Sequence, residues 1–218
     1  MATINFFTAC LAMVLMTVTG EAQAGWSDLH PPVPATPMAE GRPHLGPRAY
    51  HAMCAREPML CAADFRASTG MPGAPATMTE PRWQQVLDLN ERLNDAIRPR
   101  DDIDIYGVSD YWTEGRDIGD CEDYIIAKKQ ALMRAGWRAD QLLYAVVEGF
   151  RLPYHAVLVL RTMDGDYVLD NLTDRIEPWE ETGYDFVIRQ SAAAPANWVR
   201  VSGRATVVLG AKQLAAIR

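Results

Sequence analysis

The sequence predicts an α+β fold, in which helices come first and an antiparallel sheet follows. Two segments in the first part of the chain, starting near Pro81 and at Cys121, carry apolar residues at spacings of three and four, as one face of a helix requires. After Gly136 the pattern changes to short runs rich in Val, Leu and Tyr, separated by turn signals. A chain of 218 residues suits one domain with a tail.

The overall composition excludes several function classes. Hydrophobic residues make up 49% of the chain and charged residues 22%, which is ordinary for a globular protein. The formal net charge of -7 argues against a nucleic-acid partner, since a phosphate backbone requires a basic face. Beyond the first part of the chain no apolar run reaches the length of about eighteen residues that a membrane-spanning helix needs.

Residues 1–24 are predicted to be a signal peptide. Residues 4–18 form a mostly apolar run without a charge, and Ala22-Gln23-Ala24 is a small-x-small tripeptide of the kind that precedes cleavage. We therefore expect an exported protein, periplasmic or secreted. No Lys or Arg precedes the apolar run, so an N-terminal membrane anchor and a wrongly assigned start codon are the alternatives.

Residues 25–80 are predicted to be a Pro-rich leader followed by a loop that holds two cysteines. Six prolines fall within 25–48, where large apolar residues are few, which is typical of an extended linker or surface strap. In an oxidising compartment Cys54 and Cys61 are expected to form a disulfide, which leaves Cys121 as the odd thiol. The alternative is that all three are buried free thiols.

The predicted main domain covers residues 81–218. A helix from about Pro81 precedes a polar segment over 100–119, and a second helix runs from Cys121 to about Ala135. The predicted strands follow at 142–148, 154–161, 166–169, 186–189, 198–201 and 205–209.

Cys121, His155 and Asp170 have the residue types of an activated nucleophile with its base and acid. Cys121 begins the second helix, where unpaired N–H groups and the helix dipole favour a thiolate. His155 begins a predicted strand and Asp170 follows the next strand, so a base and an acid that orients it belong to one hairpin. Each residue taken alone is more often structural: a core cysteine, a satisfied histidine, a turn aspartate.

The predicted hairpin gives a partial geometric test of this triad. A turn centred on Asp164-Gly165 places Asp170 opposite Val159, so that His155 and Asp170 point to the same face of the sheet. Along the strand, however, His155 is four positions from Val159, which is roughly 13 Å. A different loop, a bulge or strong twist must close that gap if the triad forms.

Several sequence blocks resemble the bacterial transglutaminase-like cysteine proteinases, whose best-known members are periplasmic proteases that release large adhesins from the cell surface. The blocks are GDCEDYIIAK at 119–128, HAVLV at 155–159 and YVLDNL at 167–172, with YGVSDYW at 106–112 upstream. The resemblance implies a papain-like/transglutaminase-like core, with Cys121 as nucleophile, His155 as general base and Asp170 as orienting acid. It also implies a protein substrate such as an adhesin and, for some relatives, a membrane-bound receptor that regulates the protease.

Three acidic residues, Asp120, Glu122 and Asp123, flank the candidate nucleophile. Their charges would raise the pKa of the thiol, and a bound Ca²⁺ would offset them because carboxylate oxygens are its usual ligands. The adhesin-releasing relatives are calcium-dependent, so the resemblance implies a calcium site at these positions. The alternative is that the helix dipole alone favours acidic residues in the first turn.

Two donors are candidates for an oxyanion hole. The backbone N–H of Cys121 is the first, because it lies at a predicted helix N-terminus. The indole N–H of Trp112 is the second, since some transglutaminase-like enzymes use a tryptophan in this role. The alternative for Trp112 is an aromatic side chain of the core or of the cleft wall.

Three functions remain in competition on the sequence. The first is an exported cysteine endopeptidase that forms an acyl-enzyme which water resolves. The second is a transglutaminase or amidase on the same triad, and the third is a non-enzymatic binding module on a papain-like fold. Intact Cys, His and Asp favour an enzyme, because a binding module has no need of all three.

Overall fold

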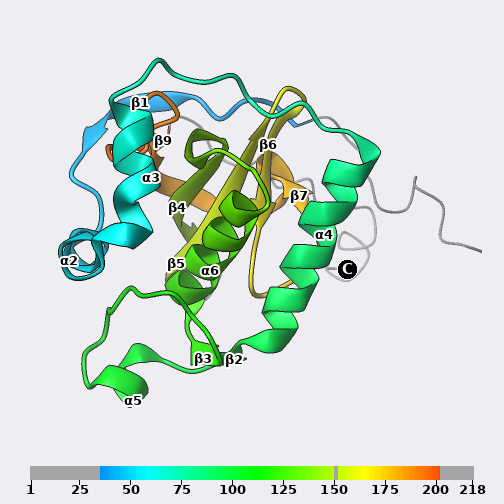
Figure 1. Ribbon diagram of the computed structural model, residues 1–218. Helices are drawn as coiled ribbons and strands as arrows, with labels where there is room; N and C mark the ends of the chain where they lie inside the picture. Colours follow the sequence, from blue (N-terminus) through cyan, green and yellow to red (C-terminus); the bar gives the residue numbers. More distant parts are fainter. Residues whose placement is uncertain (1–34, 150–151, 202–218) are drawn as a thin grey trace, which may run out of the picture.

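The structure is a computed structural model that describes residues 35–149 and 152–201 (Figure 1). The predicted signal peptide, 1–24, and the last predicted strand, 205–209, lie outside the described residues. Apart from one edge strand near the start, helices precede an antiparallel sheet, so the predicted α+β class is confirmed.

One sheet contains seven strands in the order β1-β9-β8-β4-β5-β6-β7, and each neighbouring pair runs antiparallel. The strands are β1 (Glu40–His44), β4 (Leu142–Gly149), β5 (Leu152–Thr162), β6 (Gly165–Leu169), β7 (Glu177–Pro178), β8 (Asp185–Gln190) and β9 (Trp198–Val201). A separate short parallel pair, β2 (Arg98–Pro99) and β3 (Ile118–Gly119), brings the chain to the start of α6.

The helices cover one face and one end of this sheet (Figure 1). They are α2 (Arg48–Arg56), α3 (Pro58–Ser68), α4 (Glu80–Ala96), α5 (Asp102–Tyr106) and α6 (Cys121–Arg134), with 3-10 turns η1 (Ala139–Gln141) and η2 (Trp179–Glu181). The two helices predicted near 81 and 121 are therefore α4 and α6. None of the described helices is long and apolar enough to cross a membrane.

The central strands bury both of their faces. α6 lies across one face with α4 beside it, and there Leu158 and Leu160 of β5 share a core cluster with Ile125 of α6 (Figure 1). The alternating residues of β5, Val157 and Val159, belong to a second cluster on the opposite face. Because successive strand residues alternate between faces, burial on both sides explains why β5 is apolar almost without interruption.

The described part of the predicted leader over 25–48 is extended and mostly exposed, but it forms a strand of the sheet and not a linker. β1 pairs with β9 at the edge of the sheet, and the preceding Met38 is buried in the second core cluster. The backbone of Met38 donates to the Asp166 carboxylate and accepts from Arg189. Pro43 fits β1 because an edge strand tolerates a residue without an N–H.

The prediction of a loop over 49–80 is wrong for its first part, which forms α2 and α3. Tyr50 and Met53 lie three residues apart, and both are buried against the sheet in the main core. Pro58 begins α3, where its missing N–H would have no helical partner in any case.

Cys54 and Cys61 form the predicted disulfide across the junction of α2 and α3, with their Cα atoms 5.5 Å apart. Cys61 is fully buried and belongs to the same core cluster as Tyr50 and the sheet residues. The boundary predicted at residue 81 therefore does not separate two cores within the described residues.

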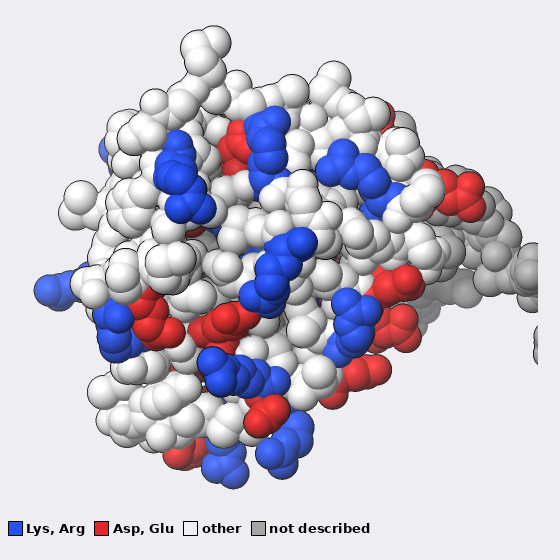
Figure 2. Space-filling model, in the orientation of Figure 1, with Lys and Arg blue, Asp and Glu red and all other residues white. Residues whose placement is uncertain are grey.

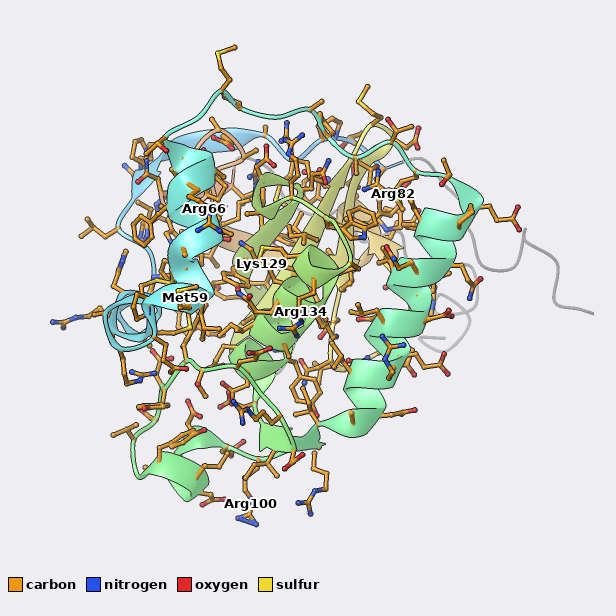
Figure 3. All side chains as sticks on the ribbon, in the orientation of Figure 1. Met59, Arg66, Arg82, Arg100, Lys129 and Arg134 are labelled. Carbon is orange, nitrogen blue, oxygen red and sulfur yellow. A yellow bond between two sulfur atoms is a disulfide. The ribbon has the colours of Figure 1, made fainter. Side chains whose placement is uncertain are left out.

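A buried ion pair connects α6 to α3. Lys129 Nζ lies 2.7 Å from Asp64 Oδ1, and both side chains are excluded from solvent. Gln190 of β8 accepts from Lys129 at 2.9 Å and donates to the other Asp64 oxygen at 2.9 Å. Figure 3 shows Lys129 between these two helices, whereas Arg134 lies farther along α6 and is exposed. These contacts thus join α3 and β8 to α6, the helix that carries Cys121.

The hairpin of β5 and β6 differs from the predicted one by its loop. Thr162 pairs with Gly165, so the turn is Met163-Asp164 and not Asp164-Gly165. Gly165 has a φ of 110°, and a Cβ there would clash with the Ala35 backbone.

This change of loop brings the predicted base and acid closer together. Leu158 pairs with Leu169, so Asp170, one residue further, falls beside Val157. His155 is then two positions away along β5, roughly 7 Å, in place of the four that the predicted turn gave. A shift of two residues keeps both side chains on the same face.

Candidate active site

Cys121 is the first residue of α6, and Asp120 is its N-cap. The parallel pairing of β2 with β3 fixes the chain immediately before this helix. The sulfur therefore lies at a helix N-terminus, as the sequence predicts. Among the described residues Cys121 is the one cysteine outside a disulfide.

A cavity of about 500 Å³ opens over Cys121 and His155. Its walls come from the β1–α2 connection, the segment before β3, the start of α6, and strands β4, β5 and β8. Trp112, Val146 and Ile188 supply apolar surface, whereas Asp110 supplies charge. Two of the three predicted triad residues thus face one space that a substrate can enter.

His155 and Asp170 form a buried hydrogen-bonded pair. His155 Nε2 lies 2.8 Å from Asp170 Oδ1, which also accepts the backbone N–H of Leu172 at 3.1 Å. Asp170 Oδ2 accepts the hydroxyl of Tyr184 at 2.7 Å. Burial tends to raise the pKa of Asp170, but these hydrogen bonds outweigh it and lower the pKa. An ionised Asp170 makes Nε2 the protonated nitrogen of a neutral His155, which leaves Nδ1 for a second partner.

The thiol of Cys121 donates to Glu122 Oε2 at 3.1 Å, and its sulfur accepts the backbone N–H of Ala156. Burial raises the pKa of the thiol, and the neighbouring Glu122 and Asp120 raise it further. The helix N-terminus alone therefore does not produce a thiolate here. In this arrangement the neighbouring carboxylates favour the neutral thiol over the thiolate.

The acidic residues beside Cys121 gather with a fourth carboxylate from α5. Asp102, Asp120 and Asp123 each place an oxygen within 4.8 Å of the others, and Asp120 and Glu122 form a second such group with Cys121. Asp102 Oδ1, Asp120 Oδ1 and Asp123 Oδ2 are buried and have no hydrogen-bond partner. No sequence pattern indicated Asp102, because it lies 18 residues from Asp120 in sequence.

Burial and repulsion between neighbouring carboxylates raise the pKa of three of these carboxyl groups. Burial is the main cause that raises the pKa of Asp102 to about 6 and that of Asp123 to about 8. Burial and the neighbouring Asp120 raise the pKa of Glu122 to about 9. Unpartnered carboxylate oxygens at this density are the donor set that a hard cation such as Ca²⁺ uses.

Trp112 lines the cavity but its indole N–H is already engaged. Nε1 donates to Asp110 Oδ1 at 3.0 Å, and the ring packs edge-on against Tyr50, Tyr144 and Trp198. This arrangement matches the alternative of a cleft-wall aromatic and not that of a free oxyanion donor.

Residues at the junction of α2 and α3 form hydrogen bonds with the segment that leads to the acidic cluster. Arg56 Nη2 donates to the Trp112 carbonyl at 2.6 Å, and Thr113 Oγ1 donates to Glu57 at 3.1 Å. The Thr113 N–H in turn donates to Asp123 Oδ1 at 3.1 Å. No sequence pattern indicated the contacts of Arg56 and Glu57, because each joins residues 56 positions apart.

Solved structures of LapG from Legionella pneumophila are similar to this chain at low sequence identity. The calcium-bound structure is 20% identical with a TM-score of 0.47, and the similarity covers 72% of this chain and 96% of that chain. A second LapG structure is 21% identical with a TM-score of 0.45, over 64% and 87% of the two chains. The EGTA-treated structure is 22% identical with a TM-score of 0.43, over 61% and 82%.

Sequence comparisons point to one family. No curated protein matches the chain. The family model for the bacterial transglutaminase-like cysteine proteinases matches residues 40–206. That match spans well over half of the 218 residues and includes every residue of the cavity described above, so the chain belongs to the bacterial transglutaminase-like cysteine proteinases and is a cysteine peptidase.

Proposed function

We propose that this peptidase is an exported endopeptidase that cuts protein substrates through Cys121, His155 and Asp170. The observation that carries the proposal is the buried His155–Asp170 hydrogen bond at the wall of a cavity that Cys121 also lines. Family membership supports peptide hydrolysis over transamidation, and it does not support a non-enzymatic binding module.

Each residue has a distinct role in the proposed reaction. The Cys121 proton passes to His155 Nδ1, and the sulfur attacks the substrate carbonyl carbon to form a tetrahedral intermediate. The backbone N–H of Cys121 stabilises the oxyanion. When the intermediate collapses, the C–N bond breaks and His155 returns the proton to the leaving amine. Water, deprotonated by His155, then hydrolyses the thioester and releases Cys121, while Asp170 keeps the imidazole oriented throughout.

A calcium site beside the nucleophile is part of the proposal. The unpartnered buried oxygens of Asp102, Asp120 and Asp123 fit a hard divalent cation, with Glu122 as a further ligand. A bound cation would neutralise the carboxylates that raise the pKa of the Cys121 thiol. Glu122 would then no longer accept the hydrogen bond from the Cys121 thiol, and the thiol could donate to His155 instead.

The substrate class and the compartment follow from the sequence resemblance. The predicted signal peptide at 1–24 supports export to the periplasm or beyond. The resemblance to adhesin-releasing proteases supports a cell-surface adhesin as substrate and a membrane-bound receptor as regulator. The disulfide between Cys54 and Cys61 agrees with an oxidising compartment.

Alkylation of Cys121 by iodoacetamide tests the triad without a known substrate. With calcium present, Cys121 of the wild type is expected to react much faster than free cysteine, and His155→Ala and Asp170→Asn are expected to slow it. Asp88→Asn, a change of an exposed aspartate on α4, is the matched control. Mass spectrometry of peptides assigns the modification to Cys121. A rate equal to that of free cysteine and indifferent to His155→Ala would overturn the proposal.

A further inference from the structure

Tyr184 is a side chain that no sequence pattern selected, yet it contacts the candidate triad directly. It lies in the turn between η2 and β8, and its hydroxyl donates to Asp170 Oδ2 at 2.7 Å. The Tyr184 and His155 rings lie side by side, with centroids 5.8 Å apart and planes inclined by 52°. One side chain therefore reaches both the acid and the base.

The sheet order explains how Tyr184 reaches Asp170. β8 and β6 are separated by β4 and β5, so the ring must extend over β4 to meet the residue that follows β6. It passes over Gly149 of β4, where an added Cβ would lie 2.9 Å from Tyr184 Cδ1. Gly149 thus leaves the space that the tyrosine ring occupies.

Tyr184 completes the hydrogen bonding of a buried carboxylate. Asp170 Oδ1 is held by His155 and Leu172, so without the tyrosine hydroxyl Asp170 Oδ2 would lose its protein partner. Asp170 and Tyr184 also line a second cavity of about 230 Å³, separate from the one over Cys121. Removal of the hydroxyl would leave Oδ2 open to water from this second cavity and the carboxylate less firmly oriented.

We infer that Tyr184 is a positioning residue for catalysis: its hydroxyl fixes the Asp170 carboxylate, which in turn holds His155 with Nδ1 directed toward the Cys121 side of the cavity. The inference rests on the proposed triad. Burial and the adjacent Asp170 carboxylate raise the pKa of Tyr184, so the phenol keeps its proton and remains a donor.

Tyr184→Phe tests this role because it removes the hydroxyl and keeps the ring. The Cys121 alkylation rate with iodoacetamide is expected to fall about tenfold, as a hydrogen bond to a charged acceptor is worth about that factor or more. Tyr167→Phe is the matched control, because its hydroxyl accepts a hydrogen bond from the Ala35 N–H and not from a triad residue. This control is expected to keep the wild-type rate.

An NMR measurement separates positioning from a loss of structure. In ¹⁵N-labelled wild-type protein the His155 Nε2–H proton is expected to exchange slowly, because Asp170 accepts it; His155→Ala assigns the signal among the four histidines. Tyr184→Phe is expected to broaden or shift this signal while the thermal unfolding midpoint and the other histidine signals stay close to wild type. Gly149→Ala, which displaces the ring but keeps the hydroxyl, is expected to act in the same direction.

The outcomes distinguish this inference from the proposed function. An alkylation rate and a His155 signal that both stay at wild-type values in Tyr184→Phe would overturn the role of Tyr184 and leave the triad intact. If wild-type Cys121 itself reacts like free cysteine, the proposed function fails, and the His155 signal alone then decides whether Tyr184 holds the pair. If Tyr184→Phe does not fold, the alkylation rate and the His155 signal of Gly149→Ala test the role of Tyr184 instead.

Discussion

At the scale of single residues, the candidate site is dominated by carboxylates that have been taken out of water. Asp102, on α5, has the same unpartnered geometry as Asp120 and Asp123 near the start of α6. A cation between α5 and the start of α6 would therefore add to the hydrogen bond from the Asp102 N–H to the Asp120 carboxylate. The charge of these carboxylates is therefore the property of the site that experiments can change most directly.

Asp102→Asn is predicted to weaken calcium binding by about tenfold or more, because loss of a ligand or its support typically reduces metal affinity by that factor. Calcium at a hundred times the wild-type Kd should stabilise the wild type by about 2.7 kcal/mol, and the variant by clearly less. Thermal unfolding with calcium and with EGTA measures both. Asp104→Asn, an exposed change on the same helix, is the control. Equal calcium stabilisation in Asp102→Asn and the wild type would exclude Asp102 from the site.

A second buried carboxylate, Asp166, predicts a pH dependence of stability that is unrelated to the active site. Burial raises its pKa from the ordinary value of 3.8 to about 6, although it accepts the Met38 N–H and lies near Arg189. Between these two values the folded protein keeps a proton that the unfolded chain loses. Stability therefore falls as pH rises across that window, by about 3 kcal/mol when the shift is fully expressed.

Asp166→Asn is expected to remove this part of the pH profile, because the amide oxygen still accepts the Met38 N–H but does not titrate. Urea unfolding at several pH values between about 4 and 7 measures the slope. Asp164→Asn, an exposed change in the neighbouring turn, should leave the slope as in the wild type. An unchanged slope in Asp166→Asn would show that other groups produce it.

At the scale of elements, the position of α6 depends on a polar contact on the side away from the cavity. Lys129 and Asp64 are both fully buried, and Gln190 of β8 bonds to both of them. A buried ion pair gives little net stability when complete but is costly to break, because the remaining charge has no partner. The pair therefore fixes how α6 sits against α3.

Lys129→Met is predicted to destabilise the protein by about 3–5 kcal/mol, since it leaves Asp64 buried and uncompensated. The double change Lys129→Met with Asp64→Leu should recover much of that loss, because it removes both charges. Denaturant unfolding gives these values. Arg134→Met, on the same helix but exposed and paired only with Glu114, should change stability by less than about 1 kcal/mol (Figure 3). A single-variant loss as small as that of Arg134→Met would contradict the role of the pair.

At the scale of the whole molecule, residues 35–80 are part of the fold. Tyr50 packs edge-on against both Trp112 and Trp198, so α2 lies between the active-site segment and the last described strand. β1 adds the edge of the sheet through β9. On the face shown in Figure 2, Lys and Arg side chains lie among Asp and Glu side chains, and no single-sign surface appears there.

A chain that begins at residue 81 is therefore predicted not to fold, although the sequence places the start of the main domain there. Its core would lack Tyr50, Met53 and Cys61, and Asp64 would no longer pair with Lys129. A chain that begins at residue 35 keeps every described contact and serves as the control. Dispersion of the one-dimensional proton NMR spectrum and cooperative thermal unfolding compare the two. A cooperatively folded chain from residue 81 would show that the first helices are an addition to a complete domain.

More of the candidate site than of the segment containing α2 and α3 could be predicted from the sequence. Cys121 could be placed at a helix N-terminus because helix periodicity and capping are local, and the parity of His155 and Asp170 followed from the strand period. Their separation was wrong because the turn was placed one residue too late: Thr162 pairs with Gly165, so the turn is Met163-Asp164. α2 and α3 were missed because a cysteine pair and prolines were given more weight than the buried spacing of Tyr50 and Met53.

The sequence by itself determined the fold class, the helix that begins at Cys121, the disulfide partners and the residue types of a nucleophile, base and acid. The tertiary structure decided which distant residues surround them: Asp102 from α5 in the acidic cluster, Tyr184 on Asp170, and Arg56 and Glu57 on the segment before β3. The physical reason is the distance along the chain over which each kind of interaction acts. Periodicity, capping and turn chemistry act over a few residues, whereas these side chains meet only after the sheet and helices have packed.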